Sequence, residues 1–393
     1  MNRWKAFART LRLNALNKFA FAYKVILIVL AIISPTLNIS RAQEAGTIFI
    51  RSDGSIEPSW APIQCVGNFY KITSNINDSI IVQKDDIVID GNNQVLQGVS
   101  SGYGFDLTGI DNVTIKYSII KGFFSGIHLF SSTNCSIINN TLTNNDIGIF
   151  LLSSSGNSIS NNTLANNDDG ILLGGSSNNY ISRNVLTLQA DYGINIKLHY
   201  SSNNTFRNNT MTETLYNLEV KGWHILHFVQ DIDTSNTINN KPMYYLVNSH
   251  DSKIPFEVGF LALVNCTNIL VENLNLTNNY DGAMIVRTNS SLIRNVNLTN
   301  NRVGIELIES FNNTVTLSCI GGNKYEGIVI FNSSDNVLVR NSIINNAHGT
   351  AYSGIALRLS GNNSIYHNNI FNNGIENQVT VTPEYDNIWD NGY

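Results

Sequence analysis

Aspartates at a regular spacing are the first residues in this chain that could do chemistry. Asp146, Asp168 and Asp191 each stand two places before a recurring glycine, and Asp169 adjoins the second of them. On stacked coils the three carboxylates would lie about 5 Å apart, which raises pKa values or attracts a cation such as Ca²⁺. The column therefore indicates either acid–base catalysis on a polysaccharide or exposed turn aspartates without a catalytic role.

Aromatic side chains hold the same position on other repeats. Phe124, Tyr280, Tyr325 and Tyr352 each stand two places before a recurring glycine, and Arg302 lies among them. On stacked coils these rings would form a row on which sugars can stack, or a ladder that only stabilises the coils. We expect the four aromatic residues to belong to a ligand-binding surface.

One histidine-containing stretch, "WHILHFVQDID" (223–233), is the candidate for metal binding. It holds His224, His227, Asp231 and Asp233, and imidazole is a good ligand for copper or zinc. In a strand, residues three apart face opposite sides, so only a loop or helix would bring the two histidines together. No cofactor is firmly predicted, and Ca²⁺ or copper is left open.

The repeat itself must position these residues, and its period is 22. Ile115, Ile137, Ile159 and Ile181 follow one another at that step. A fixed period of this length is typical of a solenoid, and the alternating apolar residues indicate strands rather than helices. The sequence therefore predicts an all-β, single-stranded parallel β-helix, right-handed because parallel β crossovers favour that hand.

The chain divides into six predicted segments around this repeat. In chain order they are a signal peptide or N-terminal anchor (1–42), an N-terminal cap with the first strands (43–100), β-helix coils (101–222), irregular coils or an excursion (223–262), further coils (263–380) and the start of a C-terminal cap (381–393). The two caps are expected because a bare terminal coil exposes strand edges.

Composition narrows the class of protein. Charged residues make up 13% of the chain, about half of the usual 25%, which disfavours helices with charged outer faces. Residues 1–42 contain basic residues and no acid, with the apolar run "VILIVLAII" (25–33), as in secretory signals. The run is shorter than the roughly 20 residues of a membrane span. The formal net charge is −5, and a nucleic-acid binder needs the opposite sign.

Four further segments resemble secreted right-handed β-helix proteins of the NosD type, a branch of the carbohydrate-binding and sugar-hydrolase β-helix domains. The segments are "DGSIEPSWAPI" (53–63), "DIVIDGNNQVLQG" (86–98), "DIDTSNTINNKPMYYLVN" (231–248) and "NIWDNGY" (387–393). Two features depart from that group, which commonly has Gly where this chain has Asn240 and continues beyond Tyr393. The resemblance implies a β-helix fold and carries an association with copper maturation.

Together the residues predict an extracytoplasmic protein, secreted or at the cell surface. We expect its flank to bind a polysaccharide or cell-envelope component without catalysis, with membrane contact only through a possible N-terminal anchor. Two alternatives remain open: a lyase, hydrolase or epimerase acting on polysaccharide, and a periplasmic copper-handling accessory protein. The oligomeric state is left open.

Overall fold

Short parallel strands make up almost all of the regular structure in the computed structural model. The described part of the chain consists of residues 46–187, 194–213, 216–375, 377–382 and 386–389. Its single helix is the four-residue 3₁₀ helix η1 (Ile225–Phe228), and no described helix could cross a membrane. The predicted signal or anchor, 1–42, lies outside these residues.

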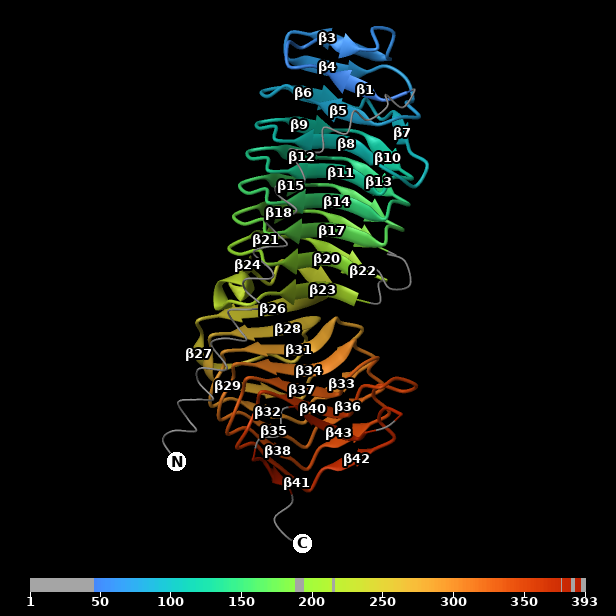
Figure 1. The fold of residues 1–393 in the computed structure, drawn as a ribbon. Coiled ribbons are helices and arrows are strands. Elements are labelled where there is room, and N and C mark those ends of the chain that lie inside the picture. Colours follow the sequence, from blue (N-terminus) through green and yellow to red (C-terminus); the bar gives the residue numbers. More distant parts are fainter. Residues whose placement is uncertain (1–45, 188–193, 214–215, 376, 383–385, 390–393) are drawn as a thin grey trace, which may run out of the picture. The chain divides into compact units, whose positions relative to one another are not determined.

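A first stack of coils, residues 48–238, has three faces (Figure 1). Sheet 1 consists of β2 (Ile56–Glu57), β1 (Ile48–Ile50), β5 (Ile80–Val82), β8 (Tyr103–Thr108), β11 (Ser125–Phe130), β14 (Ile147–Leu152), β17 (Asp169–Gly174), β20 (Ile194–His199) and β23 (Tyr216–Lys221). Sheet 2 consists of β24 (Asp231–Ile232), β21 (Thr205–Arg207), β18 (Tyr180–Ser182), β15 (Ser158–Ser160), β12 (Ser136–Ile138), β9 (Thr114–Lys116), β6 (Val88–Asp90), β4 (Phe69–Ile72) and β3 (Ile63–Val66).

The third face continues into a second stack, residues 241–389. Sheet 3 runs through β7 (Val95–Gln97), β10 (Ile119–Lys121), β13 (Thr141–Thr143), β16 (Thr163–Ala165), β19 (Val185–Thr187), β22 (Thr210–Thr212) and β25 (Thr237–Ile238). It goes on through β26 (Lys241–Val247), β28 (Phe260–Val264), β31 (Asp281–Val286), β34 (Val303–Ile308), β37 (Ile328–Phe331), β40 (Ile355–Arg358) and β43 (Val379–Thr382).

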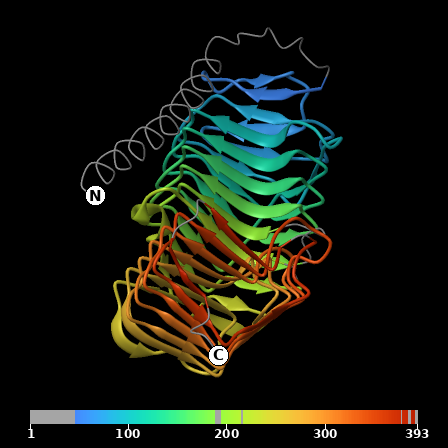
Figure 2. The same ribbon diagram turned by 60° about the horizontal axis from the view of Figure 1, so that its bottom comes forward.

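Two smaller sheets complete the second stack. Sheet 4 consists of β27 (His250–Lys253), β29 (Thr267–Glu272), β32 (Leu292–Arg294), β35 (Thr314–Thr316), β38 (Val337–Val339), β41 (Ser364–Tyr366) and β44 (Ile388–Trp389). Sheet 5 consists of β30 (Asn275–Thr277), β33 (Asn297–Thr299), β36 (Cys319–Gly321), β39 (Ser342–Ile344) and β42 (Asn369–Phe371). In Figure 2 the strands within each stack again lie one above another, and sheet 3 is the sheet that continues from the blue coils to the red ones.

The register of the strands confirms the predicted parallel β-helix. Ile137 pairs with Ile115 on one side and with Ile159 on the other, and Ile159 pairs with Ile181. All four side chains are fully buried. Residues one repeat apart are therefore vertical neighbours, and the inward Ile and Leu side chains form continuous ladders whose burial is the main favourable term in folding.

Asparagine pairs make the bends between strands. Asn139 and Asn161 hold φ values of 56° and 54°, a left-handed conformation that Asn tolerates. The second residue of each pair is buried and bonds to its neighbour, so that Asn140 Nδ2 donates to Asn162 Oδ1 at 3.2 Å and Asn162 Nδ2 to Asn184 Oδ1 at 3.0 Å. These amide ladders satisfy polar groups that would otherwise be buried without a partner.

An antiparallel strand pair joins the two stacks within the region predicted to be irregular. β25 pairs antiparallel with β26, and the following strands of sheet 3 run parallel to β26. Sheet 1, in contrast, ends at β23. Leu218 and Val220 of β23 share a hydrophobic core with Met284 and Val286 of β31, so the second stack covers the last coil of the first.

Antiparallel pairs also close the first coils. β3 pairs antiparallel with β4, and β1 with β2, before the parallel coils begin. Such pairings occupy backbone groups that would otherwise leave an open strand edge for association with another chain.

Candidate functional site

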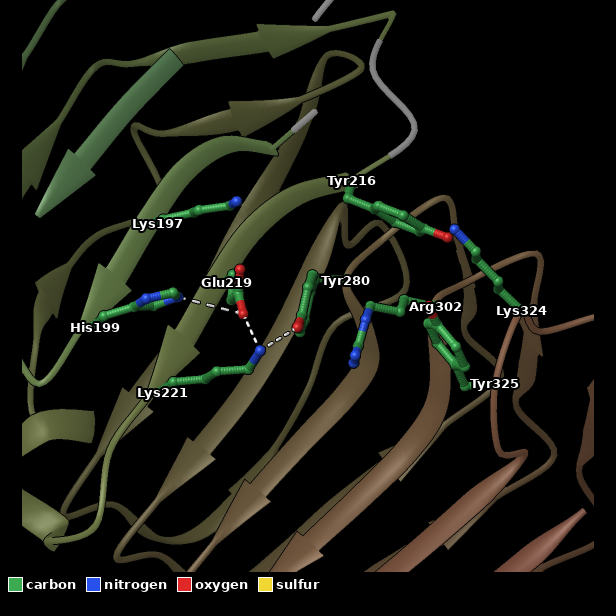
Figure 3. Close-up of a pocket in the computed structure, with 9 residues that line it drawn as sticks. All are labelled: Lys197, His199, Tyr216, Glu219, Lys221, Tyr280, Arg302, Lys324 and Tyr325. Carbon is green, nitrogen blue, oxygen red and sulfur yellow. Dashed lines mark hydrogen bonds and ion pairs between the residues drawn. The ribbon is translucent and has the colours of Figure 1, made fainter. Parts of the chain in front are cut away.

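A pocket of about 440 Å³ lies where β23 ends sheet 1 and the second stack begins (Figure 3). The two stacks meet here through Asn217, whose Nδ2 donates to Asn278 O at 2.8 Å and to Asn279 Oδ1 at 3.3 Å. The lining residues are Lys197, His199, Tyr216, Glu219, Lys221, Tyr280, Arg302, Lys324 and Tyr325.

The alternation of side chains along β20 and β23 positions the residues that the first stack contributes to the pocket. Leu218 and Val220 point into the core, so Glu219 and Lys221 face outward. In the β20–β23 ladder Lys197 pairs with Glu219, and His199 pairs with Lys221. The four side chains therefore project from one face of two adjacent strands, and in Figure 3 they extend toward Tyr280 of the second stack.

Glu219 is the buried centre of this group. Its Oε1 lies 3.3 Å from His199 Nε2 and also bonds to Lys221 Nζ, which in turn donates to the Tyr280 hydroxyl. Burial works against ionisation of Glu219, but its interactions with His199 and Lys221 outweigh burial and lower its pKa to about 2. The carboxylate stays ionised and holds His199 and Lys221 at the pocket wall.

The residues that the second stack contributes to the pocket belong to a row of side chains in contact with one another. The Arg302 guanidinium carbon lies 4.4 Å from the ring centre of Tyr280 and 4.6 Å from that of Tyr325, and the Tyr325 and Tyr352 ring centres are 4.7 Å apart. These residues stand just before successive strands of sheet 3, so the predicted row exists from Tyr280 to Tyr352. Arg302 sits between two aromatic faces, a favourable cation–π arrangement.

Arg302 has no carboxylate within ion-pair distance among the described residues, although it is only partly exposed. Burial disfavours its charge, yet the nearby Tyr280, Asp281 and Glu219 raise its pKa. The guanidinium therefore remains charged at the pocket wall without an ion-pair partner among the described residues.

A buried carboxyl group stands behind this wall. Asp281 is 3% exposed, and its Oδ1 has no hydrogen-bond partner in the described part of the chain. Burial, and next the nearby Glu306, raise the pKa of Asp281 well above its usual value, while Arg302 acts in the opposite direction. The environment therefore favours the protonated carboxyl group.

The three predicted aspartates that the structure describes do not line the pocket. Asp146 and Asp168 are exposed on adjacent coils, where Asp169 N–H donates to Asp146 O at 2.8 Å. Asp169 is not a lining residue, but it pairs with the lining residue Lys197 at 2.8 Å. Asp191 lies outside the described residues.

Of the four predicted aromatic residues, Tyr280 and Tyr325 line the pocket and Tyr352 extends the row beyond it. Phe124 is 41% exposed, and its ring lies 6.3 Å from that of Tyr103 on the first stack. Phe124 therefore belongs to another part of the surface.

The metal candidates separate into two groups. η1 brings the His224 and His227 rings to 6.4 Å, and burial and then the charge of His224 lower the pKa of His227. Asp231 and Asp233 instead pair with Arg207, at 2.5 and 3.2 Å. Among the described residues no three His, Cys, Asp or Glu side chains converge as a metal site would require.

Sequence reasoning missed His199, Glu219 and Lys221. A usable signal was present in "INIKLH" (194–199) and "YNLEVK" (216–221), because strict alternation places ionisable residues on one face of consecutive coils. The 22-residue period could not predict that these residues approach Tyr280. Lys221 and Tyr280 are 59 residues apart in the chain and meet across the junction between the two stacks.

The fold and the row of stacked side chains define a parallel β-helix protein with a pocket between its two stacks. The family model described as the right handed beta helix region matches residues 65–213 and 234–388, so the chain belongs to that family. No match was found among curated proteins.

Several solved structures are similar to this chain in fold. The mannuronan C-5 epimerase AlgE4 A-module of Azotobacter vinelandii is 13% identical, with a TM-score of 0.33, over 80% of this chain and 87% of that one. The GH87 alpha-1,3-glucanase catalytic unit of Streptomyces thermodiastaticus is 13% identical, with a TM-score of 0.31, over 81% of this chain and 61% of that one. At these values the likeness says nothing about ligand or activity.

Proposed function

We propose that the pocket between the two stacks binds an acidic saccharide by its carboxylate or sulfate group. The observation that carries this proposal is Arg302, a charged and partly buried guanidinium between two tyrosine rings with no carboxylate partner in the described chain. A planar guanidinium recognises a carboxylate through two parallel hydrogen bonds. A ligand anion would supply the partner that the protein does not.

The other charges of the pocket favour the same sign of ligand. Lys197, Lys221 and Lys324 line it together with Arg302, whereas Glu219 is the one carboxylate among the lining residues. Glu219 is already engaged by His199 and Lys221, and Lys197 is paired with Asp169. The balance is cationic, and a cationic cleft raises the local concentration of anions.

The shape and the aromatic lining suit a sugar. The volume of about 440 Å³ lies within the range of about 300–1,000 Å³ found for small-molecule sites. Tyr280 and Tyr325 offer aromatic surface beside the cationic groups, and aromatic rings combine apolar contact with a polar edge. A uronic-acid oligomer or a sulfated sugar from the cell envelope has both features, which agrees with an extracytoplasmic location.

The test is calorimetric titration with oligomers of galacturonic and mannuronic acid, beside their neutral counterparts. Arg302→Ala should weaken binding of the acidic oligomers by about 10- to 100-fold, the usual range for a lost charged hydrogen bond. Arg340→Ala is the matched control, because Arg340 is exposed and does not line the pocket. Binding of acidic oligomers that Arg302→Ala leaves intact, or equal losses in both variants, would rule the proposal out.

A catalytic role is the second candidate, and the His199–Glu219 pair favours it. A buried carboxylate at 3.3 Å orients the imidazole beside the pocket, an arrangement suited to a general base. His199 would remove the proton from the carbon next to the sugar carboxylate, and Arg302 and Lys221 would stabilise the charge formed there. Burial and then Glu219 raise the pKa of Tyr280, so its hydroxyl stays protonated beside the reacting sugar.

Turnover can be separated from binding. Incubation of polyuronates in deuterated water should introduce deuterium at the carbon next to the carboxylate, or produce an unsaturated sugar. His199→Ala should abolish this exchange while acidic oligomers still bind. Binding without any exchange would leave the protein as a binder and remove the catalytic candidate. The NosD-type branch and its copper association stay predictions from the sequence.

A further inference from the structure

A second groove lies at the opposite edge of sheet 3. Tyr280, Arg302 and Tyr325 of the first pocket stand before strands of this sheet. Four residues of the second groove directly follow β28, β31, β34 and β37, namely Asn265, Arg287, Glu309 and Asn332. With Asn289 and Phe311 they line a groove of about 230 Å³. This groove shares no residue with the acidic-saccharide pocket and is independent of it.

Two residues of the groove break the local repeat. The preceding coils place Asn248 and Asn265 at this bend, and the following coil places Asn332 there. Arg287 and Glu309 occupy the same bend with φ values of 46° and 48°. Side chains other than Asn and Gly are disfavoured in this conformation. Arg287 and Glu309, like Leu359 at the bend after β40 with a φ of 54°, therefore replace Asn where the backbone favours it.

Phe311 is a third departure on the same two coils. It directly follows a ladder of buried hydroxyl residues, in which Ser310 Oγ accepts from Thr288 N–H and Ser333 Oγ accepts from Ser310 N–H. Asn289 and Ser334 hold the equivalent place on the neighbouring coils. Phe311 is 37% exposed beside the groove and stacks on no other ring in the described structure. An apolar ring among polar neighbours offers a contact surface.

The charges of the groove balance. Arg287 Nε donates to Glu309 Oε2 at 2.5 Å, while the remaining guanidinium groups and Glu309 Oε1 make no hydrogen bond within the described residues. Asn265, Asn289 and Asn332 add amide groups that both donate and accept. The groove therefore presents paired donors and acceptors around one aromatic ring and no net charge.

We propose that this groove binds a neutral pyranose. Vicinal hydroxyl groups donate and accept at once, which matches the Arg287–Glu309 pair and the amides, and the apolar face of a pyranose ring matches Phe311. The protein then holds two saccharide sites at the two edges of sheet 3, one for an acidic unit and one for a neutral unit.

Saturation-transfer NMR tests this with mannose, galactose, glucose and N-acetylglucosamine and their oligomers as the probes. We expect at least one probe to bind, with an affinity about tenfold lower in Phe311→Ala. Phe371→Ala is the matched control, since Phe371 is an exposed phenylalanine of sheet 5. Arg302→Ala should leave the neutral-sugar signal unchanged, and thermal midpoints should confirm that each variant is folded.

Two results would overturn the proposal: no transfer to any probe, or a signal that Phe311→Ala leaves intact. Loss of the signal in Arg302→Ala would also overturn it, because the neutral sugar would then occupy the first pocket. Each result can be read apart from the acidic-oligomer titration, which reports on the other edge of the sheet.

Discussion

The repeat position two residues before the recurring glycine lies in different surroundings in the two stacks. In the first stack it carries Asp146 and Asp168, which are exposed beside an uninterrupted sheet. In the second it carries Tyr280, Arg302 and Tyr325, which line a pocket because sheet 1 stops at β23. Residue type at a repeat position is therefore not sufficient to make a site. The site forms where the stacking of coils is interrupted.

The largest expected difference is in the free energy of unfolding, between the variants Glu219→Ala and Asp168→Ala. Removal of Glu219 takes the shared partner from His199 and Lys221 at a buried position and should cost about 2–3 kcal/mol in the free energy of unfolding. Asp168→Ala, at an exposed turn, should change it by less than about 0.5 kcal/mol. Urea unfolding at neutral pH measures both. Equal losses would contradict the contrast between the two stacks.

Acid should remove the Glu219 contribution in a defined window. The pKa of Glu219 is lowered to about 2 in the folded protein, so its stabilisation is present above the unfolded value near 4.5 and is lost as pH falls toward 2. Glu219→Gln should therefore flatten the pH dependence of the thermal midpoint between these values. A wild-type curve unchanged by the substitution would show that another carboxylate is responsible.

Asp281→Asn should change the pH dependence of stability in the opposite direction to Glu219→Gln, and by a smaller amount. The raised pKa of Asp281 means that its stabilising contribution is present at low pH and is lost as pH rises above about 4. The variant should be about 1 kcal/mol more stable than wild type at neutral pH and no different at pH 3. Thermal unfolding at the two pH values checks this, and a destabilised variant at neutral pH would contradict it.

Tyr352→Ala has the smallest expected effect. Tyr352 extends the row one coil beyond the pocket and is 43% exposed. Its loss should therefore weaken the binding of long acidic oligomers a few-fold and leave the binding of a disaccharide unaffected. Titration with oligomers of increasing length measures the difference. An equal loss at every length would place Tyr352 inside the primary site rather than beyond it.

The 22-residue period was sufficient to predict the coils and the vertical rows. It placed Ile137 beside Ile159, and it placed Tyr280, Tyr325 and Tyr352 in one row with Arg302. Each of these contacts joins residues one repeat apart, so spacing alone determines them.

The remaining half of the site depends on contacts that the period does not encode. Lys221 meets Tyr280 because the antiparallel β25–β26 pair starts the second stack against the last coil of the first. The same junction decides which outward residues stay exposed, as Asp168 does, and which become pocket walls, as Glu219 does. Such a junction forms through long-range packing, for which the local residue pattern carries no signal.

The most direct measurement is a crystal structure of the protein with a bound uronic-acid oligomer. The account predicts a sugar carboxylate on the Arg302 guanidinium, between Tyr280 and Tyr325, with the next sugar units directed toward Tyr352. An oligomer bound instead along the first stack, beside Asp146 and Asp168 and away from Arg302, would contradict it.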